Sequence, residues 1–207
     1  MDKVTLPKKS GRLFRSRILE ALTRTHPALI IGMYVPVCLL SLYYHYMELS
    51  GSILATIGIA FLGAFSWTLV EYLLHRFAFH FITDHPVVQK IHHLIHGVHH
   101  DFPTDKERLI MPPVPSLIIA GTFYLLFGFF MGEAVYSFLP GFILGYLAYA
   151  MVHYAIHAFK PPFEFLKPIW RHHHLHHHKH PDRAFGVSSP FWDLIFRTMP
   201  PEKKEMR

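Results

Sequence analysis

The stretch ILATIGIAFLGAFSWTLVEYLLHRFAFH, residues 53–80, passes without a break from an apolar run to a pair of histidines. Its first part, 53–70, contains no Lys, Arg, Asp or Glu. Its length falls within the roughly 17–25 residues that a helix needs to cross a bilayer. His75 and His80 follow this run. The stretch therefore predicts a membrane helix that ends beside a histidine site.

Three other runs share this apolar character, at 28–46, 114–131 and 134–152, and none has a charged residue in its interior. Charged residues make up 16% of the 207-residue chain, below the roughly 25% of soluble domains. The runs are apolar on all sides, which disfavours the alternative that they form the core of a soluble protein. We therefore expect an all-α integral membrane protein with four transmembrane helices.

The basic residues predict how the chain is oriented. Seven of the 20 Lys and Arg residues precede the first run, and the short connections YMELSG (46–51) and MGE (131–133) contain none. Under the positive-inside rule, the segment 1–27 and the segments 71–113 and 153–207 are cytoplasmic. The formal charge of +6 is thus assigned to the membrane flanks, and no nucleic-acid partner is expected. The predicted organisation is a basic segment 1–27 and a membrane-embedded domain 28–207.

Seventeen of the 19 histidines lie beyond residue 74, and ten of them fall into four sets with regular spacing. These sets are His75 and His80; His96, His99 and His100; His153 and His157; and His173, His176 and His177. Residues three and four apart share one helix face, so each HxxHH set is expected to direct three imidazoles to one side. The five-residue spacing of the first set does not fit a regular helix, which predicts that His80 lies near a helix end or bend.

Ten imidazoles exceed the four ligands of a structural zinc ion and suit two ions of about five ligands each. Imidazole binds zinc, copper, iron and nickel, so the ligand type does not identify the metal. Neutral ligands would leave the charge of the ions uncompensated, and we hypothesise that an anionic oxygen species binds between them. The single cysteine, Cys38, excludes a cysteine-rich zinc site and an internal disulfide.

The assignment within each cluster has alternatives. His92 or His93 could replace or support His96, and the last cluster also contains His172, His174, His178 and His180. His26 and His45 are interpreted as ordinary structural histidines. A flexible metal-scavenging loop would show irregular histidines in a polar linker, whereas these follow helical spacings beside two apolar runs. A purification-tag remnant is disfavoured because Leu175 and Lys179 interrupt the last cluster and another 27 residues follow it. A metal transporter or storage protein is disfavoured because the runs lack ionisable residues along a membrane path.

Four segments together resemble one known family: EYLLHRFAFH (71–80), HHLIHGVHHDFPTDKERLIMPPVPS (92–116), HYAIH (153–157) and HHLHHHKHPDRAFGVSSPFWDLIFRT (173–198). Roughly residues 65–200 resemble the fatty acid 2-hydroxylase (sphingolipid α-hydroxylase) branch of the fatty acid hydroxylase and sterol desaturase superfamily. The patterns HGxHHxxPxDxxRLxxPP and FGxxSxxWDxxFxT distinguish this branch from sterol and carotenoid oxidases and desaturases, which remain the alternative.

The resemblance implies a membrane-embedded dinuclear metal centre that uses molecular oxygen to hydroxylate the 2-carbon of a long acyl chain, free or within a sphingolipid or ceramide. The ten histidines above would be the ligands, with no further catalytic residue. The last set is placed by counting back from Phe185 and Gly186, since six residues separate the HH pair from AFG. Iron is expected for activity, although purified protein could contain zinc.

The resemblance also implies an electron donor. Many eukaryotic members carry a cytochrome b5 domain, but residues 1–27 are too short for one, and His26-Pro27 lacks the glycines of its haem motif. We therefore expect a separate donor such as cytochrome b5 or ferredoxin. The expected location is a bacterial inner membrane, or the endoplasmic reticulum if the source is eukaryotic.

Several polar and aromatic residues have two interpretations. Glu71 and Asp101 could hold the second nitrogen of a ligand histidine, whereas Asp105 and Arg108 could pair with each other. Trp192 and Asp193 are interpreted as residues that dock the C-terminal segment against the rest of the protein. Seven aromatic residues either line a passage for the acyl chain or pack against lipid and helices: Phe123, Tyr124, Phe127, Phe129, Phe130, Tyr146 and Tyr149.

Overall fold

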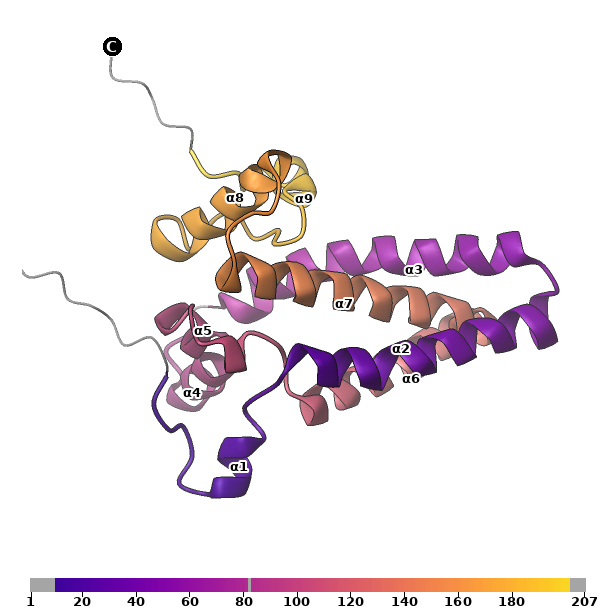
Figure 1. Ribbon diagram of the computed structural model, residues 1–207, viewed down its shortest axis with the longest axis horizontal. Coiled ribbons are helices and arrows are strands. Elements are labelled where there is room, and N and C mark those ends of the chain that lie inside the picture. Colours follow the sequence, from indigo (N-terminus) through magenta and orange to yellow (C-terminus); the bar gives the residue numbers. More distant parts are fainter. Residues whose placement is uncertain (1–9, 82, 202–207) are drawn as a thin grey trace, which may run out of the picture.

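The computed structural model describes residues 10–81 and 83–201, and these form helices and loops without a β-strand. The four long helices are α2 (Pro27–Tyr44), α3 (Ile53–Leu73), α6 (Pro113–Met131) and α7 (Val135–Ala158). The short helices gather at one end of them (Figure 1): α1 (Arg17–Ala21), α4 (Pro86–His92), α5 (Val98–Asp101), α8 (Lys167–His178) and α9 (Phe191–Ile195). The expected all-helical fold is confirmed for the described residues. Lys3, Lys8 and Lys9 of the basic flank lie outside them.

Three helical runs of the described chain are long and apolar enough to cross a membrane. They are Pro27–Ser50, Ile53–Phe79 and Lys106–Ala158, and the last one includes both α6 and α7. Gly132 lies between these two helices and has a positive φ of 56°, a conformation that glycine adopts without steric strain. The chain is therefore a membrane protein by the length and composition of its helices.

Glycines allow α3 and α7 to pack with their backbones in close contact. A Cβ atom on Gly141 would lie 1.8 Å from the carbonyl oxygen of Ala60, and one on Gly63 would lie 2.0 Å from that of Phe138. Membrane helices commonly approach each other through small residues in this way, because dispersion contacts between helices replace contacts with lipid. The pair α3 and α7 thus forms the centre of the bundle, with α2 and α6 packed against α7.

Replacing Gly141 with alanine is expected to destabilise the protein, because its methyl group overlaps the α3 backbone, which cannot move away as a flexible side chain would. Overpacking of this kind costs about 1–3 kcal/mol, which should lower the melting temperature in detergent. Gly128 of α6 is the matched control, since no atom of the described residues lies within 4 Å of the Cβ position there. Equal melting temperatures for the two alanine variants would contradict the close α3–α7 packing.

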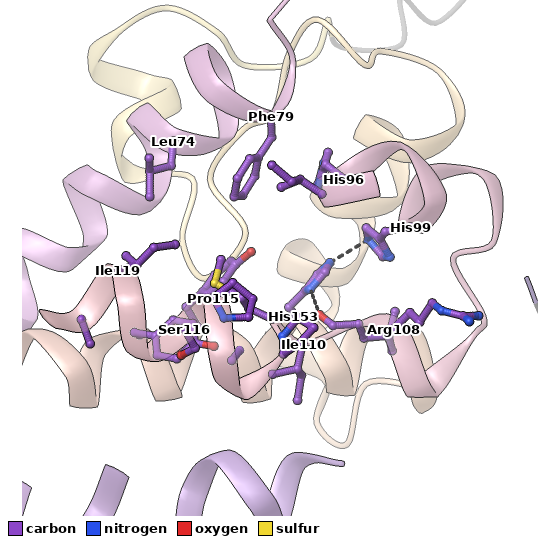
Figure 2. Close-up of a pocket in the computed structure, with 18 of the residues that line it drawn as sticks. Leu74, Phe79, His96, His99, Arg108, Ile110, Pro115, Ser116, Ile119 and His153 are labelled. Atoms are coloured by element: carbon purple, nitrogen blue, oxygen red, sulfur yellow. Dashed lines mark hydrogen bonds between the residues drawn. The ribbon is translucent and has the colours of Figure 1, made fainter. Parts of the chain in front are cut away.

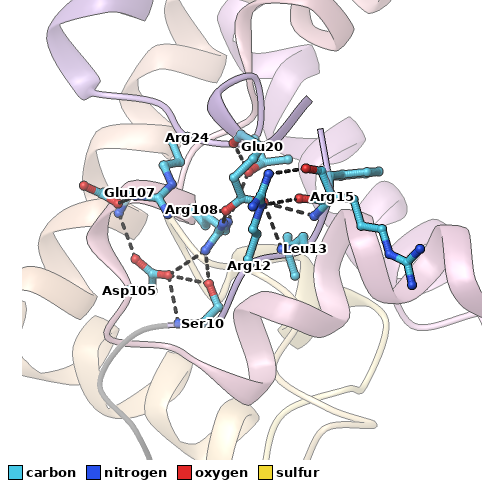
Figure 3. Close-up of polar contacts among 11 residues, drawn as sticks. Ser10, Arg12, Leu13, Arg15, Glu20, Arg24, Asp105, Glu107 and Arg108 are labelled. Carbon is cyan, nitrogen blue, oxygen red and sulfur yellow. Dashed lines mark hydrogen bonds and ion pairs between the residues drawn. The ribbon is translucent and has the colours of Figure 1, made fainter. Parts of the chain in front are cut away.

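The segment before α2 is tied to the loop before α6 by a buried polar network (Figure 3). Arg108 donates to Glu20 at 2.5 Å and to Asp105 at 3.1 Å, and it also bonds to the hydroxyl of Ser10. Glu20 accepts the backbone N–H groups of Leu13 and Phe14 at 2.9 and 3.1 Å. The predicted pairing of Asp105 with Arg108 is therefore confirmed. The network holds the segment 10–25 against the same end of the bundle as the histidines.

Candidate metal centre

The structure brings the ten predicted histidines together in two groups of five. Within each group, one nitrogen of every ring lies within 4.8 Å of the others. We name them group A and group B. Group A contains His75, His80, His96, His100 and His176, and group B contains His99, His153, His157, His173 and His177.

A π-helical turn at the end of α3 explains the five-residue spacing of the first set. The turn, η2 (Leu74–Phe79), continues α3, and His80 follows as its C-cap residue with φ −109° and ψ 23°. The wider turn lets His75 and His80 approach, with their ring centroids 5.0 Å apart. The predicted helix end at His80 is confirmed. A second π turn, η3 (His93–Gly97), leads into α5 and contains His96.

Each HxxHH set contributes to both groups, which corrects the expectation that its three imidazoles face one site. His96 and His100 belong to group A, whereas His99 between them belongs to group B. In α8 the order is reversed, with His173 and His177 in group B and His176 in group A. Residues i+3 and i+4 of a helix diverge by about 100°, so one turn can reach two neighbouring centres.

Distances within the groups fit the coordination of metal ions. Metal–nitrogen bonds of about 2.0–2.1 Å place adjacent ligands at right angles about 3 Å apart. In group A the Nε2 atoms of His96 and His100 are 2.9 Å apart, as are those of His80 and His176. In group B three such pairs span 2.8–3.1 Å: His99–His153, His157–His173 and His173–His177. The residues present therefore fit one ion per group.

Backbone carbonyls fix the orientation of three buried rings. The Nδ1 atoms of His75, His176 and His153 bond to the carbonyl oxygens of Phe185, Arg183 and Leu109 at 2.5, 2.7 and 3.2 Å. A carbonyl only accepts, so Nδ1 must carry the proton and Nε2 is left free as a donor to a metal. The Nε2 atom of His75 is buried without a hydrogen-bond partner among the described residues, as expected for a ligand atom.

The histidines are held in the neutral form that metal binding requires. Burial, together with neighbouring imidazoles, lowers the pKa of His80 and His100 to about 3. Burial also lowers the pKa of His176 to about 4, although its bond to Arg183 partly offsets the effect. The pKa values of His96 and His99 lie well below 6.5 for the same reasons. These rings remain neutral at pH 7.

The stability of the metal-free protein is expected to fall as the pH is lowered below about 6.5. There the unfolded chain binds protons that buried rings such as His176, with its pKa of about 4, do not bind in the folded state. Each fully buried ring can contribute up to about 1.4 kcal/mol per pH unit in this window. Melting temperatures of the chelator-treated protein at pH 7.5 and 5.5 test this, and equal values would contradict it.

An apolar cavity of about 500 Å³ leads to the histidines. Figure 2 shows His96, His99 and His153 on one side of it and Ser116 and Ile119 of α6 on the other. Other parts of the wall come from the four long helices and from the N-terminal segment, including Leu13, Phe14, Tyr34, Trp67, Ala120 and Phe142. The cavity thus joins the helical bundle to both histidine groups.

Only some of the aromatic residues considered for this passage line it. Phe123, Tyr146 and Tyr149 form part of the cavity wall. Phe129 and Phe130 are instead 83% and 73% exposed, as expected for side chains that face lipid. The N-terminal part of the wall was not predicted, because nothing in the apolar residues of 13–22 indicates which distant segment they cover.

Among the described residues, Glu71 holds a loop backbone and not a ligand histidine, contrary to one interpretation of it. It accepts the backbone N–H groups of Val187 and Ser188, both at 2.9 Å. Asp101 lies 3.8 Å from His93, outside both groups. The docking role of Trp192 and Asp193 is confirmed, since Trp192 donates to Thr68 of α3 at 3.0 Å and Asp193 binds the loop 185–186.

The remaining histidines lie outside the two groups. His26 caps α2, His45 bonds to Thr56 at 3.0 Å, and His172 bonds to Asp193 at 3.0 Å. His174 and His178 are exposed on α8. Of the alternatives left open by the sequence, the described structure thus gathers only the ten histidines of groups A and B.

Comparisons with known proteins agree on one family. The family model described as fatty acid hydroxylase matches residues 60–198. A human protein named fatty acid 2-hydroxylase is 35% identical over 95% of this chain and 58% of its own length. The ceramide very long chain fatty acid hydroxylase scs7 of Schizosaccharomyces pombe is 37% identical over 97% of this chain and 60% of its own. The chain therefore spans about three fifths of these relatives.

A plant relative and a solved structure match over more of their length. The dihydroceramide fatty acyl 2-hydroxylase FAH1 of Arabidopsis thaliana is 32% identical over 95% of this chain and 83% of its own length. The solved structure described as full-length scs7p, with only the hydroxylase domain visible, has a TM-score of 0.86 and 34% identity. It covers 94% of this chain and 74% of the solved chain. Sequence and fold thus point to the same relatives.

Proposed function

The chain belongs to the fatty acid hydroxylase family, and from this premise we propose that it is a membrane monooxygenase that hydroxylates the 2-carbon of a long acyl chain. The observation that best supports the proposal is the pair of five-histidine groups beside an apolar cavity. The names of the relatives support the position of the hydroxyl group. Since the chain spans about three fifths of the first relatives, the activity of a whole protein is part of the proposal.

We assign one metal ion to each group, with the ten histidines as ligands. The bound ions would activate molecular oxygen. Acid–base side chains alone cannot hydroxylate an unactivated C–H bond. The fixed Nδ1–H bonds of His75, His153 and His176 would keep their Nε2 atoms unprotonated and aimed at the ions. We propose iron for activity and allow zinc in purified protein, because imidazole binds both.

The cavity would hold the acyl chain and exclude water from the reacting carbon. Its wall is apolar along α6 and α7, whereas His96, His99 and His153 supply polar atoms at one end. Burying the polar head between the helices would cost free energy that burying the apolar tail does not, which favours entry tail first. The 2-carbon, next to the polar head, would then remain beside the histidines.

The membrane arrangement follows from the same helices. We propose that α2, α3, α6 and α7 cross the bilayer separately, since α6 and α7 have 19 and 24 residues and a turn at Gly132 between them. We propose that the histidine groups lie at the cytoplasmic boundary, which the basic residues of the connections at that end support. The expected location is a bacterial inner membrane or the endoplasmic reticulum.

The substrate is proposed to be a fatty acid or the acyl chain of a ceramide-type lipid, in line with the names of the relatives. Activation of oxygen also requires electrons, for which we propose a separate donor such as cytochrome b5 or a ferredoxin. Neither proposal involves nucleic acid.

Expression in a host that lacks hydroxylated lipids, followed by fragmentation mass spectrometry, tests the function. We expect lipids with one added oxygen, located at the 2-carbon of the acyl chain, that incorporate label from ¹⁸O₂. Hydroxylated or desaturated sterols or carotenoids, or oxygen at another carbon, would contradict the proposed activity. A cell that accumulates metal without modified lipid would favour a storage function.

A further inference from the structure

The loop of residues 183–188, which follows α8, contacts group A. Its carbonyl groups at Phe185 and Arg183 accept the Nδ1–H groups of His75 and His176. The ring of Phe185 also lies with its centroid 5.8 Å from those of His75, His80 and His176. In group B the corresponding bond, from His153, goes to Leu109 instead. The loop therefore supports one group of histidines directly.

Two buried carboxylates hold the backbone of this loop. Asp193 accepts the N–H groups of Phe185 and Gly186 at 2.9 and 2.8 Å. Glu71 accepts those of Val187 and Ser188, and its second oxygen accepts the Ser188 hydroxyl at 2.6 Å. Four successive N–H groups thus depend on two side chains from α3 and α9.

The conformation of the loop is imposed by these tertiary contacts. Ala184, which is fully buried, has a φ of 58°, a left-handed conformation that alanine rarely adopts. Gly186 has no room for a side chain, since a Cβ atom would lie 2.1 Å from the carbonyl oxygen of Ser189. Such strained residues persist only where their surroundings determine the backbone. Loss of a carboxylate should therefore let the loop relax.

We propose that Glu71 and Asp193 are positioning residues for group A: by clamping the loop 183–188, they orient His75 and His176 toward a metal ion. This inference rests on the proposed metal centre. It assigns the two carboxylates to one ion, although neither contacts a histidine of either group by a hydrogen bond among the described residues. Loss of the contacts from Glu71 and Asp193 should weaken the binding of a metal ion by group A and leave the binding by group B unchanged.

The two carboxylates differ in how they tolerate conversion to an amide. Asp193 accepts four hydrogen bonds, since His172 and Thr198 donate to it besides the two loop N–H groups. An asparagine NH₂ group cannot accept, so Asp193→Asn leaves donors facing each other at the loop. In Glu71→Gln, the amide oxygen can keep both N–H bonds while its NH₂ group donates to the Ser188 hydroxyl. Glu71→Leu removes every bond.

Zinc titration of the purified full chain in detergent tests the inference. We expect two zinc ions per wild-type chain, one for each group. In Asp193→Asn and Glu71→Leu, the affinity for one ion should fall about 10–100-fold, the usual effect of disturbing residues that support a ligand. Glu71→Gln should restore the wild-type titration. In the double variant with His99→Ala and Asp193→Asn, the affinity for the second ion, which Asp193→Asn alone leaves tightly bound, should also fall. This result would assign that ion to group B.

Glu20→Gln is the matched control, because Glu20 is also a buried carboxylate that holds two backbone N–H groups, at Leu13 and Phe14, away from the histidines. It should bind two ions as the wild type does. Wild-type protein that binds no zinc would overturn the metal centre itself. If the wild type binds two ions, the positioning role alone would be overturned by either of two results. Asp193→Asn and Glu71→Leu could bind zinc as the wild type does, or they could lose affinity for both ions equally.

Discussion

Replacing His176 or His99 with alanine is expected to lower the yield of 2-hydroxylated lipid by more than about 100-fold, since even changes to residues that support ligands cost 10–100-fold. The two residues test the groups separately, because His176 belongs to group A and His99 to group B. Each variant should also bind one metal ion more weakly than the wild type. Mass spectrometry of the lipids and metal analysis of the purified protein measure the two effects.

His174→Ala is the control for these variants. His174 lies in α8, two residues before His176, but its side chain is exposed and it belongs to neither group. Its replacement should leave hydroxylation and metal content unchanged. Full activity in His99→Ala or His176→Ala, or loss of activity in His174→Ala alone, would contradict the assignment of ligands.

The second large effect is expected from filling the cavity. Ala120 of α6 lies in the cavity wall about one helical turn beyond Ser116, farther along α6 from its start at Pro113. A tryptophan there should shorten the space for the acyl tail while leaving the histidines in place. A long chain would overpack the shortened cavity, and an overpacking cost of about 1–3 kcal/mol corresponds to roughly 5- to 150-fold in the use of that chain.

A mixture of fatty acids of different lengths, supplied to cells that express Ala120→Trp, measures this effect through the lengths of the 2-hydroxylated products. The product distribution should move toward shorter chains, with metal content unchanged. Leu125→Trp is the matched control, because Leu125 lies on the same helix, is 72% exposed and does not line the cavity. An unchanged distribution in Ala120→Trp would contradict the role of the cavity as the acyl site.

Much of the fold and of the candidate site could be predicted from local patterns. The apolar runs predicted the four long helices, since the length and composition of a run determine whether a buried or lipid-facing helix is stable. Spacing selected four sets of histidines, and the family resemblance placed the last set by its distance from Phe185 and Gly186. The structure brings these ten residues together. The irregular interval between His75 and His80 also predicted the helix end that the π turn provides.

The division of the histidines between the two groups could not be predicted in this way. His99 and His100 are neighbours in sequence but belong to different groups, and each group draws on residues from more than one part of the chain. The role of Glu71 was equally hidden, since its partners Val187 and Ser188 are more than a hundred positions away. Contacts over such distances depend on how the helices pack.

The sequence by itself determined the helical membrane bundle, the identity of the ten histidines and the end of the bundle where they lie, because apolar length and helical spacing are local properties. Only the tertiary structure decided which histidines form a group, which carbonyl fixes each ring and which side chains enclose the cavity. These features arise where α3, α5, α7, α8 and the C-terminal segment after α8 meet. A one-dimensional pattern does not encode which surfaces of those segments face one another.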